Sequence, residues 1–248
     1  MRKRYLIAAA WLTLLLLAAC SNGADSGSGG NIASTSLSAG PAEDTALHAP
    51  SARSGGQPQR SSQPYQGKVY KVVVDPGHGG EDPGAVSVSG RLEKEFNLNL
   101  SEQIAARVEQ DPQLEILLTR TGDAFISSQE LFRPQFANNL PADLFISIHG
   151  NTYEDASASG TETFYYHEES LAWAETIHKH VIQATGLKDR GVKKGNFFVL
   201  RDTVMPSVLL ELGYLTNPGD EAKMWTSVFQ ESVASAVIDG IREYLGLE

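Results

Sequence analysis

A short apolar run that ends abruptly in proline, glycine and a single histidine constrains this chain more than any other stretch. Residues 72–80 read VVVDPGHGG. A β-branched run is typical of a buried strand, and the proline and glycines that follow stop both strands and helices. His78 is therefore expected on a loop at the carboxyl end of a strand, where open α/β sheets bind their ligands. Taken alone, the stretch also fits a strand and a tight turn with His78 as an ordinary loop residue.

The same arrangement occurs again further along the chain. Residues 143–149, DLFISIH, form a second apolar run that ends in a histidine, His149. Between the two runs, residues 92–110 have a helical pattern, residues 114–119 are typical of a strand, and residues 127–139 are typical of a helix. Successive parallel strands present their carboxyl ends at the same edge of a sheet, so we expect His78 and His149 to be neighbours in space.

The rest of the chain continues this alternation of strands and helices. Residues 161–167 and 208–213 are predicted strands, residues 171–186 a helix, and residues 197–201 a short extended piece. The last helix is predicted to begin near residue 218 and to reach residue 244 in two pieces. The sequence therefore predicts one α/β domain over residues 65–248, with a mostly parallel sheet.

Two acidic residues accompany the histidines. Glu93 opens the helix after the His78 loop and should face the same sheet edge, although the helix dipole also favours an acid there. Glu211 interrupts an apolar strand, where a charge is costly unless it is paired or protonated. The alternative for Glu211 is an ion pair with Arg133 or Arg201. Imidazole and carboxylate groups are suitable zinc ligands, and an acid beside a metal-bound water can act as general base and then general acid.

Charge and cysteine content exclude several classes of partner and site. The formal net charge is −10, and loss of residues 1–19 would remove three basic residues and no acid, giving −13. Nucleic acid is not expected as a partner, because its binding depends on Lys and Arg neutralising phosphates. Cys20 is the single cysteine, which excludes an intramolecular disulfide and a multi-thiolate zinc site. A bound metal must therefore use His, Asp or Glu.

The N-terminal segment predicts export. Three basic residues at positions 2–4 precede an apolar run over residues 5–17, which is typical of a signal peptide and short for a spanning helix. Residues 17–20, LAAC, resemble the lipobox of bacterial lipoproteins, which are cleaved before the cysteine and lipidated on it. We interpret residues 1–19 as a lipoprotein-type signal peptide and residues 20–64 as lipidated Cys20 followed by a disordered, Ser/Gly-rich tether.

This interpretation predicts an extracytoplasmic protein anchored by lipid to the cell membrane, or to the outer membrane if the cell has one. The alternative is a plain signal peptide that is cleaved near small residues, without lipid on Cys20.

The motifs of residues 65–248 resemble the zinc-dependent N-acetylmuramoyl-L-alanine amidases of bacterial cell walls, of the type called amidase 3. The matching stretches follow the family's order: residues 72–84, 93–98, 119–123, 142–151, 189–193, 196–201 and 205–217. The resemblance implies a twisted sheet of about six strands flanked by helices, with one Zn²⁺ at its carboxyl edge. It implies His78, Glu93 and His149 as the metal ligands and Glu211 as the catalytic glutamate. The reaction implied is hydrolysis of the amide between N-acetylmuramic acid and L-alanine in peptidoglycan.

Three residues in the motif loops, Asn151, Asn196 and Arg201, are predicted to contact peptidoglycan, with loop pinning as the alternative. Some division amidases of this family carry an inserted helix that blocks the zinc, and residues 152–160 leave no room for one here. We expect a monomer. Two other functions fit the pattern: a non-catalytic peptidoglycan-binding lipoprotein with the amidase fold, and a zinc peptidase that cuts another bond of the stem peptide.

Overall fold

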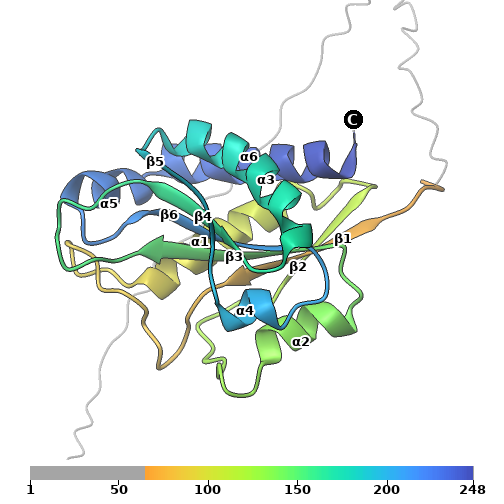
Figure 1. The fold of residues 1–248 in the computed structure, drawn as a ribbon, viewed down its shortest axis with the longest axis horizontal. Coiled ribbons are helices and arrows are strands. Elements are labelled where there is room, and N and C mark those ends of the chain that lie inside the picture. Colours follow the sequence, from red (N-terminus) through yellow and green to blue (C-terminus); the bar gives the residue numbers. More distant parts are fainter. Residues whose placement is uncertain (1–64, 248) are drawn as a thin grey trace, which may run out of the picture. The chain divides into compact units, whose positions relative to one another are not determined.

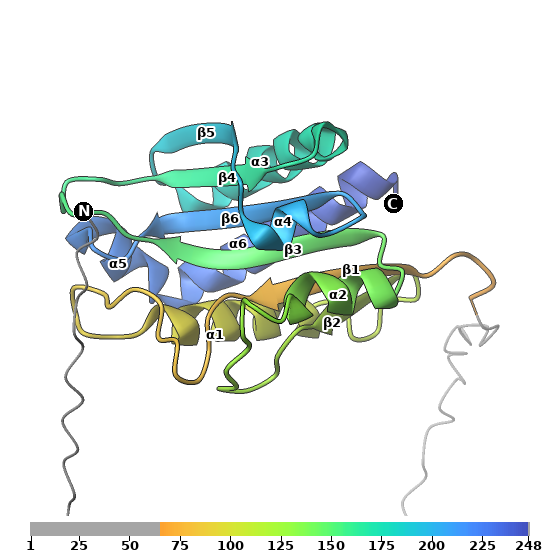
Figure 2. The same cartoon turned by 60° about the horizontal axis from the view of Figure 1, so that its bottom comes forward.

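A six-stranded sheet runs through the folded part of the chain, in the order β2-β1-β3-β6-β4-β5 (Figures 1 and 2). The computed structural model describes residues 65–247, so the predicted signal peptide and tether lie outside the described residues. The strands are β1 (Tyr70–Pro76), β2 (Leu114–Leu118), β3 (Leu144–Asn151), β4 (Thr161–Tyr165), β5 (Asp189–Lys194) and β6 (Ser207–Tyr214). Of the paired strands, β4 and β6 are antiparallel and the others parallel. The predicted single α/β domain with about six mostly parallel strands is confirmed.

Helices cover the two faces of the sheet unequally. The long helices α1 (Glu93–Ala106), α3 (Leu171–Thr185) and α6 (Ser227–Leu245) pack on one face and bury the larger apolar core with it. The short helices α2 (Phe132–Asn139) and α4 (Phe198–Arg201) lie on the opposite face, in front of the sheet in Figure 2. The 3-10 turn η1 (Glu168–Ser170) precedes α3, and α5 (Pro218–Met224) precedes α6.

Side chains alternate between these two faces along each strand. On the face with the short helices, Val73, Phe145 and Leu209 form the smaller apolar core near α2 and α4. Polar side chains follow at the next positions on the same face, towards the carboxyl ends of the strands, and among them are His149 and Glu211. The short helices therefore leave the carboxyl half of this face free for a cavity.

The structure differs from the sequence prediction in three places. Residues 197–201, predicted as extended, include the helix α4, because a single turn is too short to show a helical period. The sequence does not predict β5, whose charged residues and Gly191 have low strand propensity; pairing with β4 at the sheet edge stabilises it. The helix predicted over residues 127–139 begins at Phe132, after Leu131 adopts a left-handed φ of 52°.

His178 on α3 is buried against the sheet, and its ring hydrogen-bonds to Thr163 and Asp189. In the described part of the chain, no helix is both long enough and apolar enough to cross a membrane.

Two valines of α6 test how far the larger core stabilises the domain. Val237 is fully buried, whereas Val228 is 72% exposed. Val237→Ala should lower the free energy of unfolding by about 2 kcal/mol, from lost apolar burial and the cavity left behind. Val228→Ala, the matched control, should change it by less than about 0.5 kcal/mol. Urea unfolding followed by circular dichroism measures the difference, and equal effects of the two substitutions would contradict the packing described.

Candidate active site

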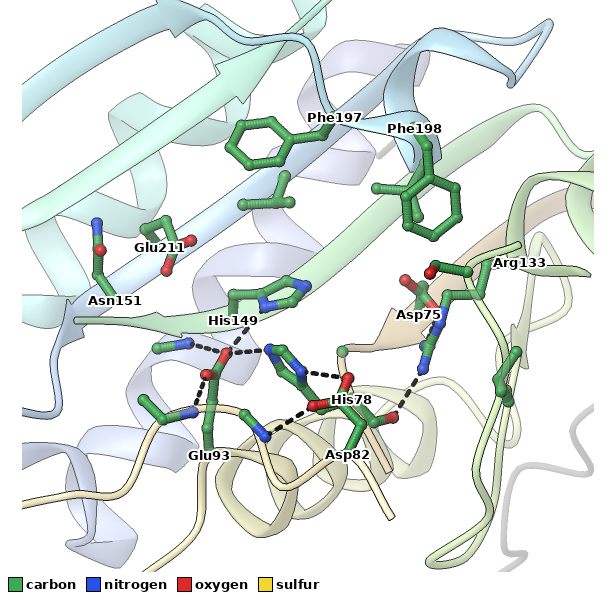
Figure 3. A pocket seen from close by; sticks show the side chains of 18 of the residues that line it. Asp75, His78, Asp82, Glu93, Arg133, His149, Asn151, Phe197, Phe198 and Glu211 are labelled. Carbon is green, nitrogen blue, oxygen red and sulfur yellow. Dashed lines mark hydrogen bonds and ion pairs between the residues drawn. The ribbon is translucent and has the colours of Figure 1, made fainter. Parts of the chain in front are cut away.

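A cavity of about 640 Å³ opens at the carboxyl half of the sheet face that carries the short helices α2 and α4 (Figure 3). One part of its lining is polar and includes His78, Glu93, His149 and Glu211. Another part is apolar and includes the side chains of Phe125, Ile126, Phe197, Phe198, Val199 and Leu209. The cavity can therefore enclose a substrate that has both apolar surface and a group for a polar reaction.

The loop after β1 places His78 in the cavity through an unusual backbone conformation. His78 has a φ of 61°, in the left-handed region that few residues other than glycine adopt. The residue before it, Gly77, packs directly against His149: a Cβ on Gly77 would lie 2.2 Å from Cε1 of that ring. The imidazole rings of His78 and His149 are 5.0 Å apart and nearly perpendicular. Glycine at position 77 is thus required for the two histidines to approach each other.

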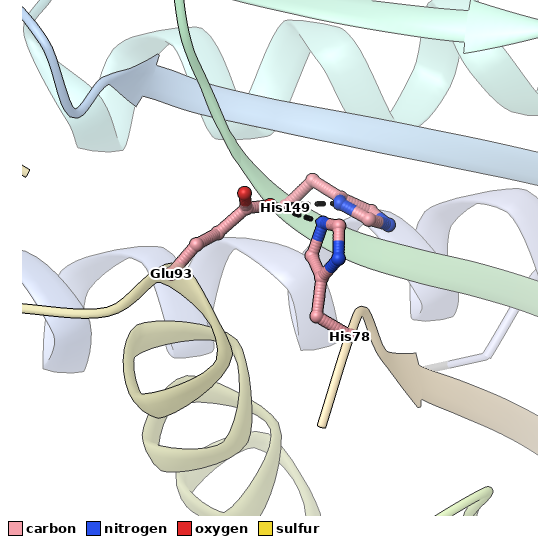
Figure 4. A group of neighbouring side chains, drawn as sticks. All are labelled: His78, Glu93 and His149. Carbon is pink, nitrogen blue, oxygen red and sulfur yellow. Dashed lines mark hydrogen bonds and ion pairs between the residues drawn. The ribbon is translucent and has the colours of Figure 1, made fainter. Parts of the chain in front are cut away.

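The Glu93 carboxylate points towards both of these histidine rings, as Figure 4 shows. Its Oε1 atom is 2.8 Å from Nδ1 of His149 and 3.2 Å from Nε2 of His78. One potential ligand atom from each of the three residues lies within 4.8 Å of the other two. Two imidazole nitrogens and one carboxylate oxygen are a donor set that suits zinc. The three residues predicted as ligands are therefore close enough to hold one metal ion.

Neighbouring groups orient this cluster. Asp82 Oδ2 lies 2.8 Å from Nδ1 of His78, which leaves Nε2 of that ring directed towards Glu93. Histidines that bind metals commonly donate their second ring N–H to a carboxylate in this way. The second oxygen of Glu93 accepts a hydrogen bond of 2.8 Å from the backbone N–H of Ala85. Asp82 was not predicted from the sequence, although it follows His78 by four residues within the same Gly-rich loop.

The charges of the cluster keep Glu93 ionised. Burial alone would raise the pKa of Glu93, but hydrogen bonds and charges of His149 and His78 hold it well below its ordinary value. Burial likewise lowers the pKa of His78, but Glu93 and Asp82 outweigh this effect and raise it overall. An ionised carboxylate is the form in which Glu93 can bind a metal.

Glu211 lies directly opposite His149 in the pairing of β3 with β6. Its Oε2 atom is buried and has no hydrogen-bond partner among residues 65–247. Burial, followed by the negative charges of Glu93 and Glu162, raises the pKa of Glu211 well above its ordinary value. Glu211 is therefore a carboxyl group with a high affinity for a proton at the wall of the cavity.

The ion pairs considered as alternatives for Glu211 do not occur. Arg133 pairs with Asp75 at 2.5 Å, and Arg201 pairs with Asp202 at 2.8 Å. A structural salt bridge therefore does not account for the acid in β6.

The three residues predicted to contact substrate lie in different surroundings. Asn151 lines the cavity, and its Nδ2 donates a hydrogen bond of 2.6 Å to Glu162, which fixes the amide (Figure 3). Asn196 and Arg201 lie outside the cavity lining and bond to each other at 3.2 Å. Contact of these three residues with substrate stays a prediction.

Asp75 forms a separate buried network at the end of β1, beside the cavity. Its carboxylate accepts hydrogen bonds from Thr119 Oγ1 at 2.5 Å, Ser147 Oγ at 2.8 Å and Arg133 Nη1 at 2.5 Å. Burial alone would raise the pKa of Asp75, but the charge of Arg133 and these hydrogen bonds lower it overall. An ionised carboxylate thus joins β1 to the adjoining strand ends and to α2.

Metal-dependent hydrolases combine histidine and carboxylate ligands with a nearby acid that transfers protons, and the cavity of this chain holds residues of the same kinds, His78, Glu93, His149 and Glu211. A sequence comparison defines the class more closely. Residues 72–243 match the family described as N-acetylmuramoyl-L-alanine amidase, Amidase_3, and the chain belongs to this family.

Solved structures support this assignment. The catalytic domain of the amidase CwlV from Bacillus (Paenibacillus) polymyxa var. colistinus is 44% identical, with a TM-score of 0.70 over 73% of this chain and 100% of that one. The amidase AmiC2 of Nostoc punctiforme is 37% identical, with a TM-score of 0.68 over 73% of this chain and 99% of that one.

The chain is also similar to relatives known from sequence. The Bacillus subtilis protein YqiI is 39% identical over 75% of this chain and 88% of its own length. The probable cell wall amidase LytH of Staphylococcus aureus is 33% identical over 75% of this chain and 61% of its own length. The similarity to LytH thus covers less than two thirds of that protein.

Gly77→Ala tests the close approach of the two histidine segments. The added methyl group should displace the His149 ring and lower zinc affinity by about tenfold or more. Gly122→Ala is the matched control, because nothing lies within 4 Å of the Cβ position there. Competition with a chromophoric zinc chelator measures both affinities. Wild-type affinity in Gly77→Ala would show that the ring position does not depend on this glycine.

Asp75→Asn tests the buried carboxylate by its pH dependence. The pKa of Asp75 is lowered on folding, so its stabilising effect is complete above the unfolded pKa of about 3.9 and is lost as the pH falls through the folded value. At pH 7 the variant should be less stable by about 3 kcal/mol, because Arg133 is left without its buried partner.

That difference in the free energy of unfolding should stay constant between about pH 7 and 5 and shrink below about pH 4. The difference is measured by urea unfolding of the wild type and the variant over this pH range, with a metal chelator present in both. A difference that grows on acidification would mean that Asp75 is not ionised in the folded protein.

Proposed function

We propose that this chain is a zinc-dependent amidase that hydrolyses the bond between N-acetylmuramic acid and L-alanine in peptidoglycan. Its family is that of the N-acetylmuramoyl-L-alanine amidases, and the similar solved structures of CwlV and AmiC2 are amidases of this kind. The observation that carries the proposal is the Glu93 carboxylate in contact with both His78 and His149, with Glu211 opposite His149 and its Oε2 atom without a hydrogen-bond partner among residues 65–247.

His78 Nε2, Glu93 Oε1 and His149 Nδ1 would hold the metal in this proposal. Their mutual distances, the ionised Glu93 and the Asp82 hydrogen bond to His78 all fit a catalytic zinc site of two histidines and a glutamate. When bound, Zn²⁺ supplies Lewis-acid polarisation of the substrate carbonyl and lowers the pKa of a water molecule.

Glu211 would move the proton in both halves of the reaction. As a water oxygen bonds to the lactyl carbonyl carbon, Glu211 accepts a proton from that water. As the carbon–nitrogen bond breaks, it returns the proton to the departing alanine nitrogen. The products are a carboxylic acid on the sugar and a free amine on the stem peptide, and Glu211 ends in its starting state. The raised pKa of Glu211 supports this role, because the acid must hold the proton between the two steps.

We further propose that the enzyme acts outside the cytoplasm, anchored to a membrane by lipid on Cys20. A relative named as a probable cell wall amidase supports the extracytoplasmic location. The anchor rests on the sequence motif of residues 17–20 alone. The domain boundaries at residues 19 and 64 rest on sequence in the same way.

Digestion of purified peptidoglycan distinguishes the amidase from its two alternatives. The zinc-loaded protein should release intact stem peptides that begin with a free L-alanine amine, identified by mass spectrometry, and excess chelator should stop the release. New ends inside the stem peptide would instead indicate a zinc peptidase. Binding without release would indicate a non-catalytic wall-binding protein.

Glu211→Gln should lower the rate of this release by about 10²–10⁴-fold, because the amide cannot accept and return the proton. Its zinc content should equal that of wild type, since Glu211 is not among the proposed ligands. Glu175→Gln on the exposed side of α3 is the matched control and should keep wild-type activity. Activity of Glu211→Gln within tenfold of wild type would exclude the proposed proton transfer.

A further inference from the structure

We propose that Arg133 and Arg120 are positioning residues for His78, which they hold through the backbone of its loop rather than through its ring. The inference rests on the proposed metal site, in which His78 is a ligand. In this proposal the two arginines keep that ligand in place although the conformation of the loop itself is unfavourable.

The two arginines bind three consecutive carbonyl groups. Arg133 donates from Nη1 to the carbonyl of Pro76 and from Nη2 to the carbonyl of His78, both at 2.7 Å. Arg120 donates from Nε to the carbonyl of Pro76 at 3.0 Å and from Nη2 to that of Gly77 at 2.9 Å. The backbone from residue 76 to residue 78 is therefore held at every carbonyl by a guanidinium group.

The conformation of His78 explains why such contacts are needed. A φ of 61° is strained for a residue with a side chain, and His78 keeps this conformation because the surrounding structure fixes it. The hydrogen bond from Arg133 to the His78 carbonyl acts on the strained residue itself. The Arg120 bond to Gly77 fixes the residue before it, which packs against His149. Together these contacts set where the His78 imidazole lies relative to His149.

Arginine suits this role better than lysine. Both arginine residues are 5% exposed, and the carboxylate of Asp75 compensates the charge of Arg133 at 2.5 Å. A guanidinium is a planar fork with five donors, so Arg133 reaches Asp75, Pro76 and His78 at the same time. A lysine at this position can keep the ion pair with Asp75 but cannot reproduce the fork.

Arg133→Lys is therefore the decisive variant. We expect its zinc affinity to fall by about tenfold or more in competition with a chromophoric chelator. We also expect the visible absorption spectrum of the cobalt-substituted variant to differ from that of wild type, because this spectrum reports the geometry of the ligands. Both readouts use the metal alone and do not depend on activity.

Thr119→Val is the matched control. Thr119 donates to the same Asp75 carboxylate at 2.5 Å, and none of its hydrogen bonds reaches the carbonyls of residues 76–78. The Thr119→Val variant should have a lower free energy of unfolding in urea but the zinc affinity and the cobalt spectrum of the wild type. Equal losses of zinc affinity in both variants, or unchanged affinity and spectrum in Arg133→Lys, would overturn the proposal. If Arg133→Lys does not fold, Arg120→Lys replaces it, and we expect the same loss of zinc affinity and the same change of the cobalt spectrum.

The wild-type titration separates this inference from the proposed function. Wild type that binds no zinc would overturn the metal site and the positioning role together. Wild type that binds zinc but releases no stem peptides would contradict the amidase alone, and the comparison of Arg133→Lys with Thr119→Val would still decide the positioning role.

Discussion

The buried carboxylate of Asp75 is the interaction on which the arrangement of the site depends most. It lies where β1 approaches its end and accepts hydrogen bonds from the segment after β2, from β3 and from α2. An ionised carboxylate out of water is stable only when it is paired and hydrogen-bonded, so these elements must meet before it is satisfied. Arg133, which pairs with Asp75, also bonds to the His78 carbonyl. The same arginine thus compensates the buried charge of Asp75 and holds the backbone of His78, a predicted metal ligand.

The unequal covering of the sheet explains why the site has room for a large substrate. A parallel sheet is normally covered by helices on both faces. Here the face with α2 and α4 keeps its carboxyl half open, and the polar side chains of that half line the cavity. The register of the strand pairing places three polar side chains in a row, because His149, Glu211 and Glu162 are consecutive partners across β3, β6 and β4. The alternation of side chains along the strands thus places apolar residues of the core at one end of this face and these three polar residues at the other.

Sequence alone could predict the features that depend on local pattern. Two strands that end in histidine and an acid inside an apolar strand indicated His78, His149 and Glu211. The choice of Glu93 among the acids rested mainly on the resemblance to the amidase family, and the structure brings all four residues to one cavity. It could not predict β5, which depends on pairing at the sheet edge, or α4, which is a single turn. Nor could it predict the hydrogen bond from Arg133 to His78, which joins residues 55 positions apart and depends on how α2 packs.

The contrast between Glu211 and Glu162 shows how the fold gives two neighbouring acids different roles. They face each other in the pairing of β4 with β6. Burial would raise the pKa of Glu162, but hydrogen bonds from Lys193 and Tyr214 lower it overall, so this acid stays ionised and orients its partners. Glu211 lacks such a cation in the described structure, and its pKa is raised. Where two acids have their pKa values pushed apart by their surroundings, the acid with the raised pKa is the one suited to hold and transfer a proton. In the proposed reaction this acid is Glu211, whereas Glu162 fixes Asn151 at the cavity wall.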